Sequence, residues 1–240
     1  MDMANDAELN PQELAGAAKA RAAFYAFLSV HFTTLPDAPF VERMRSGDFT
    51  TMLEALVKDD SVEPDIATGA SLMRAYLDNT LGDEVAQLAE KLGVDRTRLY
   101  RGITPEYGPP PPYQTVWTRS RAGQDVEILQ TLAGLYREMG LAPSPEATER
   151  LDYIGVELDF LRELALREAA AWESDKPETA ATWVAAQQAF MNEHLGEWAP
   201  AFVEKALEWA KTDFYQGHLL MLRGFITGEL RDLNLPGETQ

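Results

Sequence analysis

Four consecutive prolines at residues 109–112 constrain the fold of this chain more than any other feature of its sequence. Proline holds φ at about −65° and lacks a backbone N–H, so a run of prolines adopts the extended polyproline II conformation and joins neither a helix nor a sheet. Aromatic residues flank the run, with Tyr107 before it and Tyr113 and Trp117 after it. We therefore expect a stiff loop that either holds a binding groove open or simply crosses the domain, with its aromatic side chains in the core.

Outside this loop, apolar residues recur at helical spacing and do not alternate with the period of a strand. The first helix is expected to begin at Pro11, because Asn10 is a favourable N-cap and proline is favoured at the first helical position. Gly93 and Gly196 are expected to end helices, as glycine often does. The predicted helices cover residues 11–33, 39–46, 49–57, 64–77, 83–92, 95–101, 124–139, 145–171, 177–195, 198–210 and 214–233.

This pattern predicts an all-α fold, a single-domain bundle of about ten helices with the proline-rich loop in mid-chain. The domain is expected to span residues 11–234, with flexible tails at residues 1–10 and 235–240.

The net charge of the chain indicates which classes of partner it attracts and which it repels. Acidic residues outnumber basic ones by 39 to 21, a net charge of −18. Such a surface repels nucleic acid and anionic lipid and attracts basic partners, although an acidic protein can also be acidic only for solubility. No apolar run approaches the roughly 20 residues of a membrane span, and residues 1–10 lack the features of a secretory signal. We therefore expect a cytoplasmic protein with no nucleic-acid partner and no stable membrane insertion.

The sequence carries no recognisable catalytic or metal-binding motif. It has no cysteine, and its three histidines, His31, His194 and His218, do not stand at metal-ligand spacing. Neither a nucleophile elbow nor a glycine-rich nucleotide loop occurs. We expect a binding protein rather than an enzyme, with no metal and no cofactor of its own. The alternatives are a helical small-molecule-binding protein or enzyme, with a buried polar cluster, and an assembly scaffold with a large apolar patch.

Three stretches, taken in order, resemble one family. Residues 95–102 (D-R-T-R-L-Y-R-G) lead through the proline loop to residues 112–117 (P-Y-Q-T-V-W). Residues 151–161 (L-D-Y-I-G-V-E-L-D-F-L) follow, and then residues 194–202 (H-L-G-E-W-A-P-A-F) with a later F-Y pair. Together they resemble the TorD/DmsD/NarJ family of cytosolic chaperones for molybdenum-containing oxidoreductases. The chain departs from the family at Tyr153, where many members have a histidine.

The resemblance implies a function. Members of this family bind the N-terminal twin-arginine signal or leader of their client, the apo-form of a molybdenum oxidoreductase catalytic subunit, until its molybdopterin cofactor is loaded. It leaves open which oxidoreductase is the client and whether the leader is a complete or a degenerate signal. It also leaves open whether the chaperone is a monomer or a homodimer.

A twin-arginine leader offers two guanidinium groups followed by an apolar run. Its recognition calls for carboxylates that accept forked hydrogen bonds and for an apolar groove. The helix predicted at residues 145–171 supplies Asp152, Glu157 and Asp159 as candidate carboxylates, with the two aspartates on nearly one face. Its tyrosine, Tyr153, can lie over a guanidinium. We expect the groove between this helix and the proline loop. The candidate peptide-binding residues are Tyr107, Tyr113, Trp117, Asp152, Tyr153, Glu157 and Asp159.

Several of these residues also have structural explanations. Asp152 can make a local interaction with Arg150, and Glu157 can pair with an arginine such as Arg98. The three aromatic residues around the prolines can belong to the core.

Overall fold

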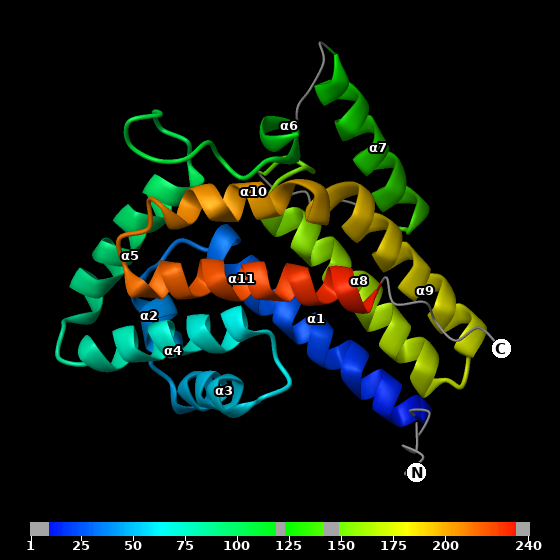
Figure 1. The fold of residues 1–240 in the computed structure, drawn as a ribbon, viewed down its shortest axis with the longest axis horizontal. Coiled ribbons are helices and arrows are strands. Elements are labelled where there is room, and N and C mark those ends of the chain that lie inside the picture. The colour runs from blue at the N-terminus through cyan, green and yellow to red at the C-terminus, as the bar shows by residue number, and fades with distance from the viewer. Residues whose placement is uncertain (1–9, 119–122, 142–148, 234–240) are drawn as a thin grey trace, which may run out of the picture.

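The computed structural model describes residues 10–118, 123–141 and 149–233, and its regular secondary structure in these ranges is helical (Figure 1). This confirms the predicted all-α, single-domain bundle. The two predicted tails lie almost entirely outside the described residues. The elements are α1 Pro11–Thr33, α2 Ala38–Met44, α3 Gly47–Lys58, α4 Pro64–Asn79, α5 Val85–Tyr100, α6 Gln114–Trp117, α7 Gln124–Glu138, α8 Ile154–Glu173, α9 Pro177–Phe190, the π-helix η1 Met191–Leu195, α10 Gly196–Leu207 and α11 Asp213–Asp232.

The long helices pack in pairs around one core. The most extensive contacts join α1 to α8, α11 to α4 and α8 to α9, while α11 lies between α4 and α10 (Figure 1). The start of α1 is set locally by a capping box. Asn10 Oδ1 accepts the backbone N–H groups of Gln12 and Glu13 at 3.0 Å, and the Glu13 carboxylate accepts the N–H of Asn10 at 2.9 Å.

Three predicted helix boundaries are wrong. Helix α5 runs through Gly93 without a break, and η1 carries the chain past Gly196 into α10. A Cβ atom at Gly196 would lie 2.5 Å from the carbonyl oxygen of Met191, so glycine is needed there inside the turn. Residues 149–153 are not helical, and α8 begins only at Ile154. The first residues of the helix predicted from residue 145 lie outside the described residues.

Helices α4 and α11 cross with their backbones in direct contact. A Cβ atom at Gly69 would lie 2.4 Å from the carbonyl oxygen of Gly217, and a Cβ atom at Gly217 would lie 2.4 Å from that of Gly69. Any larger residue at either position must push the two helices apart. This crossing therefore fixes where α11 lies on the bundle.

Replacing Gly217 by alanine should lower the free energy of unfolding by about 1–3 kcal/mol, the usual cost of overpacking a tight interior. Gly93 is the matched control, since it is also helical and nothing lies within 4 Å of its Cβ position. There the exchange should raise the free energy by about 0.5–1 kcal/mol, because alanine favours the helix. Urea denaturation of both variants measures the difference. Equal effects at the two positions would contradict the close crossing.

Two histidines, His31 and His218, stack in the core with ring centroids 4.7 Å apart, and both are fully buried. His31 Nδ1 lies 2.8 Å from the carbonyl oxygen of Phe27, and His218 lies 3.0 Å from the hydroxyl group of Tyr100. Burial lowers the pKa of His31 from 6.5 to about 4 and holds the pKa of His218 well below its ordinary value. Both rings are therefore neutral at neutral pH, and their role is structural.

These lowered pKa values predict acid sensitivity. Between pH 6.5 and pH 4 the unfolded chain takes up protons at His31 that the folded chain does not, so stability falls by up to about 1.4 kcal/mol per pH unit for this group. Buried Glu157 and Glu229 have raised pKa values and oppose the trend. The free energy of unfolding is therefore measured against pH for wild type and for His31→Phe. Both proteins contain Glu157 and Glu229, so the contribution of these two residues cancels in the comparison. Wild type should lose stability relative to the variant as the pH falls. Parallel stability curves would exclude this role for His31.

Candidate functional site

The proline loop is bound by its backbone to the segment that leads into α8. Tyr113 and Tyr153 form an isolated antiparallel bridge. Beside it, the N–H of Gln114 donates to the carbonyl oxygen of Asp152 at 2.9 Å, and the N–H of Ile154 donates to that of Pro112 at 3.0 Å. We call residues 111–117 and 149–154 together the proline-loop junction. It brings together two of the three motifs that carry the family resemblance.

Two glycines let the loop fold back onto the end of α5. Gly102 has a φ of +58°, and a Cβ atom there would lie 2.4 Å from the ring of Pro111. A Cβ atom at Gly108 would lie 2.0 Å from the carbonyl oxygen of Arg98. The path of the loop therefore depends on glycine at both positions.

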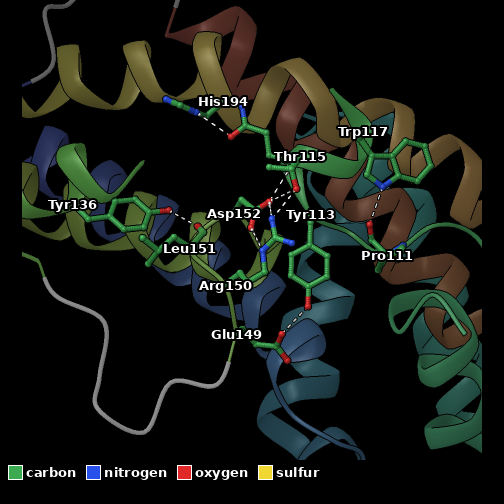
Figure 2. A network of polar contacts seen from close by, with 11 residues as sticks. Pro111, Tyr113, Thr115, Trp117, Tyr136, Glu149, Arg150, Leu151, Asp152 and His194 are labelled. Atoms are coloured by element: carbon green, nitrogen blue, oxygen red, sulfur yellow. Dashed lines mark hydrogen bonds and ion pairs between the residues drawn. The ribbon is translucent and has the colours of Figure 1, made fainter. Parts of the chain in front are cut away.

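Asp152 is the centre of the junction (Figure 2). Its carboxylate is fully buried, and its Oδ2 atom accepts the N–H of Thr115 at 3.2 Å and the hydroxyl group of Thr115 at 2.7 Å. Arg150 donates a fork to it, from Nε to Oδ1 and from Nη2 to Oδ2, both at 3.0 Å. Arg150 Nη2 also donates to Thr115 Oγ1 at 2.8 Å. The local interaction with Arg150 that the sequence suggested is therefore present, and it neutralises the buried charge.

The guanidinium group of Arg150 also stacks on Tyr113. Its central carbon lies 5.2 Å from the centroid of the Tyr113 ring. The Tyr113 hydroxyl group donates to Glu149 at 2.9 Å, and Arg101 donates to the same carboxylate at 3.0 Å. Burial and the hydrogen bond to Glu149 raise the pKa of Tyr113 to about 12, so the hydroxyl group remains a donor at neutral pH.

The rest of the loop is held by α10 and η1. Trp117 Nε1 donates to the carbonyl oxygen of Pro111 at 3.0 Å (Figure 2). Its ring meets the ring of Phe202 edge-on, with centroids 5.6 Å apart. His194 Nδ1 lies 3.1 Å from Gln114 Oε1. Burial lowers the pKa of His194, which keeps its ring neutral. His194 is not among the candidate residues predicted from the sequence, although it opens the last motif.

The side chains of Tyr153, within the junction, and of Glu157, on α8, are buried in the core. The Tyr153 hydroxyl group donates to the carbonyl oxygen of Phe32 at 2.9 Å. Glu157 Oε2 accepts the indole N–H of Trp198 at 3.1 Å, so Glu157 does not pair with Arg98 as the sequence suggested. Its other oxygen has no hydrogen-bond partner among the described residues. Burial raises the pKa of Glu157 well above its ordinary value, which favours a neutral carboxylic acid.

The remaining two candidates lie outside this network. Asp159 is partly exposed on α8 and lies 3.4 Å from Arg162. Asp152 precedes α8, so the two aspartates do not share a helix face as predicted. Tyr107 is 37% exposed, and the guanidinium carbon of Arg98 lies 5.3 Å from its ring centroid. The structure thus brings together Tyr113, Trp117, Asp152 and Tyr153, with Glu157 below them.

The described residues hold no group of three or more histidine and acidic side chains that could bind a metal ion. Within the same ranges, every helix is too short or too polar to span a lipid bilayer. The fold and the junction define an all-helical protein whose distinctive feature is a proline loop held in place by hydrogen bonds to the buried Asp152.

Comparison with known proteins identifies the family. Residues 61–204, more than half of the chain, match the family model of the nitrate reductase delta subunit. The chain belongs to this family, the TorD/DmsD/NarJ family of molybdoenzyme-maturation chaperones, as the sequence motifs indicated.

Its relatives include the chaperone protein TorD of three bacteria. TorD of Vibrio vulnificus (strain CMCP6) is 24% identical over 214 residues, which cover 89% of this chain and 94% of that protein. TorD of Aliivibrio fischeri is 25% identical over 221 residues, covering 92% and 98%. TorD of Photobacterium profundum is 28% identical over 162 residues, covering 68% and 72%. These relatives are named chaperones, a non-enzymatic family, which supports the expectation that the chain is not an enzyme.

The Thr115 hydroxyl group should contribute measurably to stability, because it donates to a buried charge. Thr115→Val should lower the free energy of unfolding by about 1.5–3 kcal/mol. Thr118→Val is the matched control, since the Thr118 hydroxyl group is buried without a partner among the described residues. That exchange should be close to neutral. Urea denaturation tests both variants, and an equal loss at the two positions would contradict the stated role of Asp152.

Proposed function

We propose that this chain is a system-specific chaperone that binds the N-terminal twin-arginine signal or leader of a molybdopterin-containing oxidoreductase subunit. It acts on the apo-form of that subunit in the cytoplasm and assists cofactor insertion and assembly before export. Family membership is the observation that carries this proposal. The net charge of −18 supports it, because an acidic surface attracts a basic leader.

The chemistry of the junction also supports guanidinium recognition. Asp152, Thr115 and Tyr113 together offer a carboxylate, a hydroxyl group and an aromatic face, and the chain already holds one arginine there. Arginine matches such a set better than lysine, because only its planar fork makes two hydrogen bonds to one carboxylate. We propose that the leader binds at this junction.

The candidate residues then divide into two groups. Tyr113, Trp117 and Asp152 lie at the junction, and the more exposed Tyr107 and Asp159 would extend contact along the leader. Tyr153 and Glu157 are buried at 2% and 0% exposure, which favours a supporting role beneath the bound peptide.

Isothermal titration calorimetry tests the proposal with a synthetic twin-arginine leader and the same peptide with both arginines changed to lysine. We expect saturable binding that is at least about tenfold weaker for the lysine peptide, since lysine cannot make the fork. Asp152→Asn should also weaken binding. Asp65→Asn is its control, because Asp65 binds a fork from Arg223 at the contact between α4 and α11.

Tight binding that is indifferent to lysine would move recognition to apolar contacts along the loop. No binding to any leader by protein with an intact circular dichroism spectrum would contradict the proposed function.

A further inference from the structure

Arg150 makes the contacts that a bound arginine ligand would make. Its guanidinium group forms a fork with Asp152, donates to Thr115 and stacks on Tyr113. Its side chain is 49% exposed, while the side chain of Asp152 is 0% exposed. The guanidinium group therefore contacts both solvent and the buried carboxylate.

Comparison with other arginine–aspartate pairs sets Arg150 apart. Arg223 makes a similar fork with Asp65, at 2.6 and 3.0 Å, but the side chain of Asp65 is 34% exposed. Arg98 donates one bond, at 2.8 Å, to buried Asp95. Asp95 also accepts two backbone N–H groups and a hydroxyl group from the segment that leads into α11, so it would keep three donors without Arg98.

Asp152 depends on Arg150 more strongly. Within the described ranges, the only donor to its Oδ1 atom is Arg150 Nε, whereas Oδ2 is also bound by Thr115. If the arginine side chain swung away, one carboxylate oxygen would lose its donor and become open to a new one. The vacated space would present that oxygen and the face of the Tyr113 ring.

We propose that Asp152, Thr115 and Tyr113 form a guanidinium-binding site that Arg150 occupies, and that an arginine of the leader binds by displacing Arg150. The displacement rests on the proposed function, whereas the site itself does not. Arg150 therefore competes with the arginine of the leader for the same site and lowers the apparent affinity of the leader.

The size of this reduction in affinity follows from the fraction of time for which the site is vacant. A ligand that needs the vacant site binds with an apparent affinity reduced by the fraction of time for which the site is vacant. If Arg150 occupies the site for about 90–99% of the time, a leader binds roughly 10–100-fold more weakly than it would to a vacant site. A free guanidinium compound cannot compete at millimolar concentration with an arginine only two residues away in the chain. A leader must therefore bring further contacts.

Chemical rescue tests the site without any leader. Arg150→Ala should lower the melting temperature by roughly 6 °C or more, because it leaves a buried carboxylate unpaired. N-ethylguanidinium at tens of millimolar should restore at least about half of this loss by refilling the site, as expected for a ligand that binds only the folded state. Ethylammonium, with equal charge but no fork, should not. Arg150→Gln, which keeps most of the side-chain stem, serves if the alanine variant does not fold.

Two control variants define the origin of the rescue. In Arg150→Ala/Asp152→Asn the rescue should disappear. In Arg223→Ala it should be much smaller, since the vacated carboxylate is already partly exposed. Rescue that does not distinguish ethylguanidinium from ethylammonium would overturn the site, whatever the leader does.

Calorimetry with the twin-arginine leader tests the displacement. Arg150→Gln should bind the leader about 10–100-fold more tightly than wild type. Unchanged or weaker binding would overturn displacement. Selective rescue combined with no leader binding by any variant would contradict the proposed function and the displacement, and would leave the guanidinium site established.

Discussion

The structure of the proline-loop junction depends on the burial of one negative charge. A carboxylate removed from water without partners is very unfavourable, and Asp152 is tolerated because Thr115 and Arg150 surround it with donors. These donors come from both sides of the junction. The buried charge is therefore satisfied only when the end of the proline loop contacts the segment before α8. In the chain, α8 begins at Ile154, directly after the residues that make this contact.

Other buried charges also need hydrogen-bond partners, and they too connect segments that are distant in the chain. Asp95 on α5 accepts N–H groups at residues 211 and 212 and so fixes the segment before α11. Buried Arg96 donates to the carbonyl oxygens of His31 and Phe32 at the end of α1. Each of these charges satisfies backbone groups that the helices leave unpaired at their ends. In this bundle, buried charges hold the helix ends while apolar side chains fill the space between helices.

The sequence predicts features that neighbouring residues decide, and fails where distant residues decide. The start of α1 follows from Asn10 and Glu13, and the prediction is correct. The late start of α8 depends on Thr115, about forty residues away in the chain, and helical spacing cannot reveal it. The sequence could offer Arg150 as a partner of Asp152 because the two are close in the chain. It could not show that the carboxylate is buried, nor that Glu157 binds Trp198 rather than Arg98.

The proline run separates two similar stacks of arginine on tyrosine. Arg98 lies over Tyr107 on one side of it, and Arg150 lies over Tyr113 on the other. Proline fixes φ at about −65°, so the run is stiff, and the number of its residues sets the spacing of the two stacks. Insertion or loss of a single proline would change that spacing while leaving each stack chemically intact. The length of the run is thus the geometric variable that sets how far apart these two arginine side chains are held.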